Sequence, residues 1–241
     1  MNRALVILLA MPSVLFAQPA SQPALKAPPV ITPGALPTSA PSDAVIYFDG
    51  TSLDNWATRD GKPAGWKCDS KAGGAMTGVP KTGDVVSKKT FGSAQIHVEF
   101  MEPVTNGEGQ DRGNSGVYIH GRYEVQVLDS YKSETYPDGQ CGAVYKQYVP
   151  LVNACRPPGE WQTYDIIFHA AKLEGGKRTA PARLTVVHNG VLIQDNVELQ
   201  GPTGGAIGQE ETATGPLLLQ EHGHEVKYRN IWVRPLLAQP R

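Results

Sequence analysis

The residues best suited to acid–base chemistry lie in one short stretch, Arg112–Tyr131, which reads "RGNSGVYIHGRYEVQVLDSY". The tyrosine and the valines of its second half would share one face of a β-strand, which leaves Arg122, Glu124 and Gln126 on the other face. A carboxylate on a rigid strand, flanked by a guanidinium and an amide, can act as a general base toward a polar ligand. The alternative is that Glu124 pairs with a cation of a neighbouring strand on a solvated outer face.

Three nearby side chains are further candidates for the same site. His120 follows Tyr118 on one face of the preceding strand, and the glycine after it could bend the chain into a cleft. An imidazole can serve as acid, base or metal ligand near neutral pH, so His120 is a catalytic candidate and Tyr118 a substrate contact. The alternative for His120 is a hydrogen-bonded histidine at a strand end. Asp129 is a candidate for the rim of the site or for a metal ligand, and it could equally cap a turn with Ser130.

A second cluster of polar side chains occurs in "LLLQEHGHE" near the C-terminus. By alternation Gln220 and His222 share one face, so we predict that both contact the substrate and that His222 can take part in catalysis. The His222 and His224 pair has an H-x-H spacing that can bind a metal, but this signal is weak, and a divalent ion stays an open cofactor. Lys146 and Tyr145 are candidates to line the cleft, and the lysine could hold an oxyanion, although most lysines are only solvated charges.

The loop 106–116, "NGEGQDRGNSG", superficially resembles a phosphate-binding loop. It lacks the Lys-Ser/Thr ending and leads into a strand, so the pattern does not predict phosphate binding. The oxygens of Asp111 and Asn114 could bind calcium, but a loop with Asx-type turns is the favoured interpretation. Arg112 could contact a substrate from this loop.

The elements that must position these residues are predicted to be β-strands. Alternating runs begin at Ala44 and recur over residues 94–101 and 163–170, and Asn189-Gly190 joins two apolar runs as in a type I′ hairpin. Residues 215–223 and 225–235 look like a closing pair of strands, and Trp56 is expected to fold back onto the core. Many short strands separated by turn signals indicate an all-β fold, a β-sandwich or jelly roll.

The whole chain has 241 residues and a net charge of -1. This balance argues against nucleic acid as a partner, because phosphate-binding surfaces usually carry a basic excess. Residues 1–17 have the charge and apolar run of a signal peptide, and residues 18–42 form a Pro/Ala-rich segment expected to be a disordered linker. The folded domain is predicted over 43–237. We therefore expect a secreted or periplasmic protein with no membrane span after signal removal; a retained N-terminal anchor is the alternative.

The three cysteines leave one thiol unpaired in any pairing. Cys141 and Cys155 flank a segment that could fold back on itself, so a disulfide between them is the predicted pair, against the alternative of three free thiols. Zinc is not predicted, because no closely spaced histidine accompanies the cysteines.

Taken together, several of these stretches resemble a known family. They are "LDNW", "GNSGVYIHGRYEVQVLDSY" and "GPLLLQEHGHEVKYRNIWVRPL", with "GEWQTYDIIFHA" and "HNGVLIQD" between them. In order, they are similar to the bacterial 3-keto-disaccharide hydrolase domain, also described as 3-keto-glucoside 1,2-lyase/3-keto-2-hydroxyglucal hydratase. The resemblance covers roughly Ala44 to Leu236. It implies a concanavalin A-like jelly roll, export, and an oxidised 3-keto sugar as substrate.

The implied reaction needs a base near C2, a donor or cation at the C3 oxygen and an acid at the leaving oxygen. Glu124, His120 and His222 are the predicted catalytic residues. The predicted substrate contacts are Arg122, Gln126, Asp129, Lys146, Gln220 and Tyr118. Two other functions stay open at this stage. One is a non-catalytic carbohydrate-binding module, and the other is a conventional glycosidase in which Glu99 or Glu221 partners Glu124.

Overall fold

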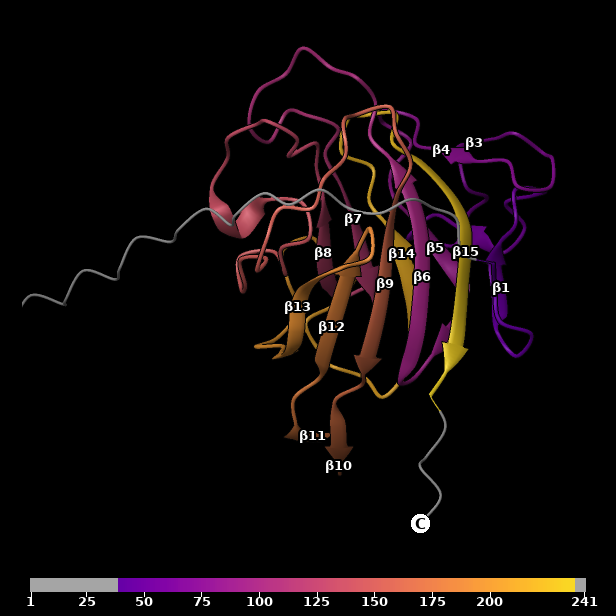
Figure 1. Cartoon of the computed structure of the whole chain (residues 1–241). Coiled ribbons are helices and arrows are strands. Elements are labelled where there is room, and N and C mark those ends of the chain that lie inside the picture. The colour runs from indigo at the N-terminus through magenta and orange to yellow at the C-terminus, as the bar shows by residue number, and fades with distance from the viewer. Residues whose placement is uncertain (1–38, 237–241) are drawn as a thin grey trace, which may run out of the picture.

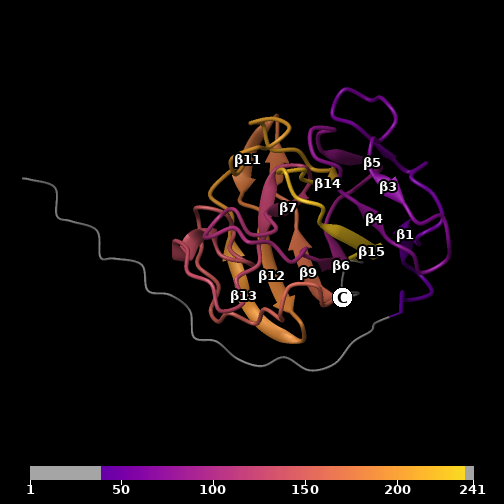
Figure 2. The ribbon, with the colours of Figure 1, turned by 90° about the horizontal axis from the view of Figure 1, so that it is seen from above.

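The computed structural model describes residues 39–236, which form two antiparallel β-sheets packed face to face (Figures 1 and 2). The predicted signal peptide and all but the last four residues of the predicted linker lie outside this range. Within it, the single helical segment is a short 3-10 turn, η1 (Pro137–Gly139). The all-β jelly-roll prediction is confirmed.

The larger sheet has eight strands. In spatial order they are β13 (Val191–Glu198), β12 (Arg183–His188), β9 (Gln162–His169), β6 (Ala94–Met101), β15 (Lys227–Pro235), β4 (Met76–Thr77) and β3 (Lys67–Cys68), with β1 (Val45–Phe48) also paired to β15. The smaller sheet has the order β2 (Trp56–Ala57), β5 (Val85–Phe91), β14 (Gly215–Leu219), β7 (Ser115–Ile119) and β8 (Tyr123–Val127). A separate ribbon pairs β10 (Lys172–Glu174) with β11 (Lys177–Ala180).

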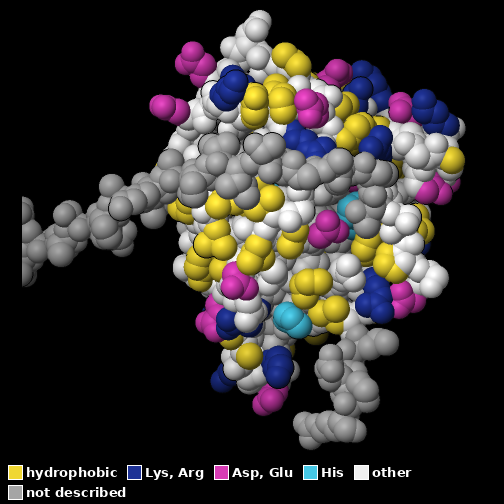
Figure 3. Space-filling model, viewed as in Figure 1, with side chains coloured by type: hydrophobic (Ala, Val, Ile, Leu, Met, Phe, Trp, Pro, Cys, Tyr) yellow, Lys and Arg dark blue, Asp and Glu magenta, His cyan; other side chains and the backbone are white. Residues whose placement is uncertain are grey.

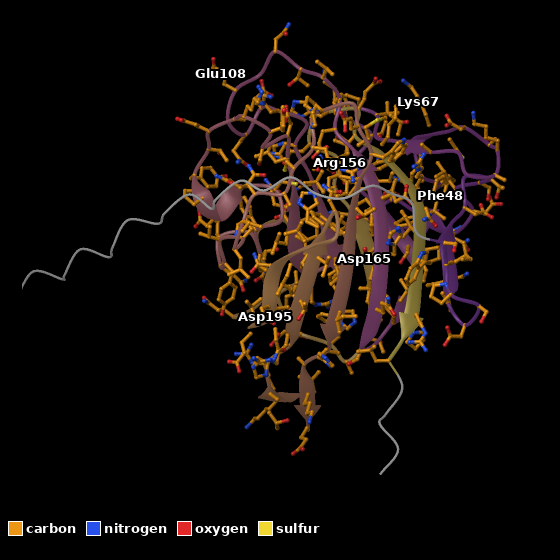
Figure 4. The ribbon with its side chains drawn as sticks, viewed as in Figure 1. Phe48, Lys67, Glu108, Arg156, Asp165 and Asp195 are labelled. Carbon is orange, nitrogen blue, oxygen red and sulfur yellow. The ribbon has the colours of Figure 1, made fainter. Side chains whose placement is uncertain are left out.

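The core fills the space between the two sheets, as the crowded side chains of Figure 4 show. Each strand contributes alternate residues, because successive side chains point to opposite faces of a sheet. From β6, Ile96, Val98 and Phe100 are fully buried in this core. Trp56 folds back onto it as predicted and donates its indole N–H to the carbonyl of Tyr47 at 3.0 Å.

The Asn189-Gly190 pair joins β12 to β13 with φ angles of 53° and 82°. These left-handed values are those of a type I′ turn, so the predicted hairpin is confirmed. By contrast, the prediction that residues 215–223 and 225–235 pair with each other is wrong. Strand β14 pairs with β5 and β7 in the smaller sheet, whereas β15 pairs with β1, β4 and β6 in the larger one. Apolar alternation alone does not say to which sheet a strand belongs.

The hairpin β7–β8 decides which residues face away from the core. Val117 lies opposite Val125 and both enter the core, so the neighbouring pair Tyr118 and Glu124 lies on the outer face of the smaller sheet. The free edge of β8 is covered by residues 140–148. There the amide of Tyr145 donates to the carbonyl of Glu124 at 3.2 Å. The outer face of this hairpin, which carries Tyr118 and Glu124, is therefore covered by other segments and is not a plain solvated surface.

Two other features concern the sequence predictions. The thiols of Cys141 and Cys155 are both free, so the predicted disulfide is not formed. In the described range, no helix is long and apolar enough to cross a membrane. On the face drawn in Figure 3, basic and acidic side chains are interspersed, and neither forms a large charged patch.

Candidate active site

A pocket of about 180 Å³ opens on the outer face of the smaller sheet. Its floor is made by strand side chains, and its walls come from the loop before β7, the segment that covers β8 and the loops before and after β14. The lining residues are Gln110, Asn114, Tyr118, Glu124, Gln126, Tyr145, Gly204, Gly205, Gln220 and His222. Five of them, Tyr118, Glu124, Gln126, Gln220 and His222, belong to the predicted site. The volume is below the ~300–1,000 Å³ typical of drug-sized ligand pockets, so it suits a single sugar ring.

Among the residues that the structure describes, Glu124 is the one carboxyl group that lines this pocket, and only 3% of it is exposed. Burial raises the pKa of its carboxyl to about 8, and the negative charge of Asp84 adds to this, while the Tyr118 hydroxyl acts in the opposite direction. The backbone of Glu124 is fixed on both sides, because its amide donates to Thr203 Oγ1 at 3.0 Å and its carbonyl accepts from Tyr145. A carboxyl group with a pKa near neutrality, in a pocket, is typical of a catalytic acid or base.

Gln126 holds one oxygen of that carboxyl group. With its amide nitrogen turned toward the strand, Gln126 donates to the carbonyl of Ser115 at 3.0 Å and to Glu124 Oε1 at 2.9 Å. This orientation gives the amide nitrogen two acceptors on the strand side, and hydrogen-bond partners are the criterion for assigning amide groups. A donor at this position stabilises the ionised form of Glu124 and fixes where its other oxygen points.

Tyr118 is locked beside Glu124 by two hydrogen bonds. Its hydroxyl donates to the carbonyl of Gly204 at 2.8 Å and accepts from Gln220 Nε2 at 3.1 Å. Burial, reinforced by the charge of Glu124, raises the pKa of Tyr118, so its phenol is neutral. Tyr118 and Gln220 thus present fixed neutral hydrogen-bonding groups to a ligand.

Two glycines keep the pocket open where a side chain would fill it. A Cβ added at Gly116 would lie 2.4 Å from Glu124 Oε1 and 2.8 Å from the Tyr118 ring. At Gly205, where φ is +79°, a Cβ would lie 2.7 Å from the Tyr118 hydroxyl. Gly116 therefore makes room for the carboxyl group that the neighbouring strand supplies.

The mouth of the pocket carries an exposed imidazole and a phenol. His222 is exposed at the rim, while Tyr145 is half-buried and shares a 2.7 Å hydrogen bond with the hydroxyl of Tyr136. Lys146 points elsewhere. Its Nζ lies 3.4 Å from the centroid of the Tyr136 ring and 3.3 Å from Asp138, so it does not line the pocket.

The prediction that His120 shares the face of Tyr118 is wrong. His120 has a φ of 55°, and this left-handed turn conformation carries its side chain into the core. The ring packs against Phe91 and Phe168 at centroid distances of 5.1 and 4.6 Å, and its Nε2 lies 3.2 Å from the carbonyl of Gly92. Burial lowers the pKa of His120 to about 4. The imidazole is thus a buried neutral ring, which matches the structural alternative.

Arg122 and Asp129 also lie outside the pocket. The guanidinium of Arg122 donates to the backbone carbonyls of Glu210 and His120, and so braces the loop that follows Thr203. The carboxylate of Asp129 pairs with Arg112 and accepts from the amide of Tyr131 at 3.1 Å, which is a turn-capping role. The same pair directs Arg112 away from the pocket.

The loop between β6 and β7 contributes Gln110 and Asn114 to the pocket (Glu108, labelled in Figure 4, marks its top). Asn114 Nδ2 donates to the carbonyl of Gln110 at 3.0 Å, and the Asp111 carboxylate lies 3.2 Å from His224 Nε2. Asn114 and Asp111 thus have separate partners, and the other ring nitrogen of His224, Nδ1, lies 3.1 Å from the carbonyl of His222. Gln110, Gly204 and Gly205 were missed because they lie in loops, where no periodicity marks the side facing a ligand.

Arg59 and Asp84 join the two loops at the rim. Arg59 donates to the carbonyl of Gly205 at 2.5 Å and to Asp84 at 2.6 Å, and Asp84 accepts from the amide of Glu221 at 2.8 Å. The same pair lines a second, larger hollow of about 460 Å³ next to the first. Arg59 lines the second hollow, and its hydrogen bond to Gly205, which lines the first pocket, places it between the two.

The chain was compared with known proteins. The profile of the 3-keto-α-glucoside-1,2-lyase-like domain family matches residues 43–234. A crystal structure from Parabacteroides distasonis, provisionally named a glycosyl hydrolase, is 41% identical with a TM-score of 0.77, covering 90% of this chain and 95% of its own. A second such structure from that organism is 19% identical with a TM-score of 0.59, covering 80% and 94% of the two chains, and shows the fold alone. No curated protein matches the chain.

Proposed function

The chain belongs to the 3-keto-α-glucoside-1,2-lyase-like domain family, and from this premise we propose that it is an exported carbohydrate-active enzyme that cleaves 3-keto-glycosides. The observation that carries the proposal is the single buried carboxyl group of Glu124, with a pKa of about 8, in a pocket of neutral hydrogen-bonding groups. Such a pocket suits one proton abstraction from a hydroxyl-rich ring.

In the proposed reaction the Glu124 carboxylate removes the proton from C2 of the sugar. The ketone at C3 makes this proton acidic, because the electron pair it leaves is delocalised onto the C3 oxygen as an enolate. The electrons then return to form the C1=C2 double bond, and the glycosidic oxygen leaves C1 with a proton. Water adds across the double bond, with hydroxide at C1 and a proton at C2, so the sum is hydrolysis.

The described residues allow a role to be assigned to each part of this sequence. The amide of Gln220 and the hydroxyl of Tyr145 line the pocket, where they would donate to the C3 oxygen as it develops charge. His222 is exposed at the mouth, where it can supply a proton to the leaving oxygen. Gln126 positions the base.

A conventional two-carboxylate glycosidase is less well supported. That mechanism needs a second carboxyl group at about 5–9.5 Å, facing the same substrate. Glu99 lies on the larger sheet and pairs with Arg229 at 2.6 Å. Glu221 accepts from backbone amides, including that of Lys81 at 3.0 Å. Neither residue lines the pocket that holds Glu124.

The second hollow suggests where the leaving group binds. It adjoins the pocket through Arg59 and carries polar groups from two loops, including Thr58, Lys62 and Thr82. We assign the oxidised ring to the smaller pocket and the leaving sugar to this larger, more open hollow, because a disaccharide would have to extend past the Arg59 wall.

The test is to incubate the purified protein with a 3-keto-disaccharide and, separately, with its unoxidised parent. We expect monosaccharides from the oxidised sugar only, and exchange of the C2 hydrogen with deuterated water. Glu124→Gln keeps the shape of the side chain but removes the base, so turnover should fall roughly 10²–10⁴-fold while binding changes far less. His169→Gln, on an exposed strand end, is the matched control.

Two results would sink the proposal. A protein that binds both sugars and turns over neither is a carbohydrate-binding module. Cleavage of the unoxidised parent at a comparable rate would indicate conventional glycosidase chemistry. Export is tested separately, by mass spectrometry of the protein from its native host, where an intact Met1 would contradict signal removal.

A further inference from the structure

Three side chains that bind metals in other proteins meet in the core, although they are distant in the sequence. Cys141 comes from the segment that covers β8, Cys155 from the loop before β9, and His188 from the end of β12. One potential ligand atom of each lies within 4.8 Å of the others, and all three residues are buried. The sequence did not predict a zinc site, because its cysteines have no neighbouring histidine; the fold supplies one.

Other polar groups surround this cluster. The hydroxyl of Tyr164 lies 3.0 Å from Cys141 Sγ, and Glu102 Oε1 lies 3.9 Å from the same sulfur. Glu102 has no exposed surface. Its Oε1 faces the thiol of Cys141, whereas its Oε2 accepts from Gln162 at 2.6 Å. Burying the ionised form of this carboxyl group is costly unless a cation or further donors lie beside it.

The imidazole of His188 is oriented as metal-binding histidines usually are. Its Nε2 lies 2.9 Å from Gln162 Oε1, an amide oxygen that also accepts from the backbone amide of Arg156 (labelled in Figure 4) and from Asn189 Nδ2. Because this oxygen can only accept, His188 donates from Nε2, and its other ring nitrogen keeps a lone pair. A hydrogen bond on one ring nitrogen commonly fixes the tautomer for metal binding by the other.

We propose that Cys141, Cys155 and His188, with Glu102 as fourth ligand, bind one divalent ion of the zinc class. Two sulfurs, one nitrogen and one carboxylate oxygen form a donor set that suits tetrahedral Zn²⁺. Typical Zn–S and Zn–N bonds of ~2.3 and ~2.0 Å would require the ligand atoms of Cys141, Cys155 and His188, which lie within 4.8 Å of one another, to approach by about an ångström, and the Glu102 carboxylate would have to move in to join them. The protons of the two thiols and of the Glu102 carboxyl group pass to solvent as the ion binds.

The site is structural in this proposal, with four protein ligands and no position left for substrate. It would add a covalent link between three segments that are already joined by hydrogen bonds, such as that from Asn189 Nδ2 to the carbonyl of Ala154 at 2.9 Å. One of these, carrying Cys141, continues to Tyr145 in the wall of the active-site pocket. Since the ligands are buried, the ion would be taken up during folding.

The experiment uses the full chain, unfolded in guanidinium with a phosphine reductant and refolded with or without one equivalent of Co²⁺ or Zn²⁺. After desalting we expect one ion per chain, tetrahedral Co²⁺ absorption with sulfur-to-cobalt charge transfer, and a higher Tm than the metal-free protein. Cys141→Ser, Cys155→Ser and His188→Gln should each lose most of the bound ion. Cys68→Ser and His169→Gln, which change the same residue types outside the cluster, should retain it.

A second measurement avoids variants that fail to fold. Bound Zn²⁺ should protect Cys141 and Cys155, but not Cys68, from alkylation during partial unfolding, as read by peptide mass spectrometry. Absence of bound ion after refolding, or binding that no cluster substitution reduces, would overturn the proposal. So would a Cys141–Cys155 disulfide in protein taken from its native host.

Discussion

Glu124 is the residue on which the proposed chemistry depends, and its ionisation gives a direct test. The base form is the minor form at pH 7, because burial raises the pKa of Glu124 to about 8. We therefore expect kcat/KM on a 3-keto-glycoside to rise about tenfold per pH unit below about 8 and to level off above it. A rate that instead falls above pH 8 would make Glu124 the general acid.

Substitution of Asp84 should shift the dependence of kcat/KM on pH. Its negative charge contributes to the raised pKa of Glu124, so Asp84→Asn should shift the rising limb to lower pH. Asp60→Asn, a neighbouring carboxylate that pairs with Lys62 at 2.6 Å, is the control and should leave the limb in place. An unchanged limb in Asp84→Asn would indicate that another group titrates.

At the residue scale, the sequence predicted the strand residues of the site and not the loop residues. Glu124, Gln126 and Tyr118 follow from two-residue alternation, since a strand leaves only two directions for a side chain. His120 was misplaced because one left-handed φ interrupts that alternation. Lys146 also has a positive φ, of 60°, and turns toward Tyr136.

At the scale of elements, the site depends on the close pairing of β7 with β8. Gly116 faces Gln126 in the register, and a Cβ there would collide with the Glu124 carboxyl group. We expect Gly116→Ala to lower kcat/KM by roughly 10²-fold, because displacement of a catalytic group by about an ångström has effects of that order. Gly92→Ala, where the nearest atom is 3.5 Å away, is the control. Equal activity of the two variants would show that the carboxyl group tolerates the shift.

The rim loops form a second element-scale unit, held together by Arg59 and Asp84. Replacing Arg59 by Met removes its hydrogen bonds to Gly205 and Asp84 and lowers the wall between the two hollows. We expect KM for a 3-keto-disaccharide to rise several-fold, with a much smaller change for a 3-keto-glucoside whose leaving group is methanol. The Arg59 guanidinium is exposed at the rim, so its ion pair with Asp84 should contribute little to stability and Tm should change little. If KM rose equally for both substrates, the leaving group would bind somewhere other than the second hollow.

Element identity was easier to predict than element partnership. The runs 94–101 and 183–195 became β6 and the β12–β13 hairpin because their local patterns specify strands and a turn. Strands β14 and β15 went to different sheets, since partner choice depends on packing contacts across the whole chain. The cluster of Cys141, Cys155 and His188 also depends on how distant segments pack, so no spacing in the sequence predicts it.

At the scale of the whole molecule, histidines packed between the sheets make the sandwich sensitive to acid. His120 contacts Phe91 of the smaller sheet and Phe168 of the larger one, so it bridges the two layers. Burial lowers its pKa from 6.5 to about 4. Between these values the unfolded chain binds a proton that the folded protein does not, so stability is full above the unfolded pKa and decreases as pH falls toward 4.

The free energy of unfolding should therefore decrease as pH drops from 6.5 to 4.5, with about 2 kcal/mol of the decrease coming from His120. His120→Asn tests this, because asparagine tolerates the left-handed backbone and does not titrate. We expect the variant to be less stable at pH 6.5, where packing against both phenylalanines is lost, but to lose less on acidification, as measured by denaturant unfolding at each pH. His169→Asn, at an exposed position, should keep the steep pH dependence of the parent. If His120→Asn also keeps the steep pH dependence of the parent, other groups cause the acid sensitivity and His120 contributes packing alone.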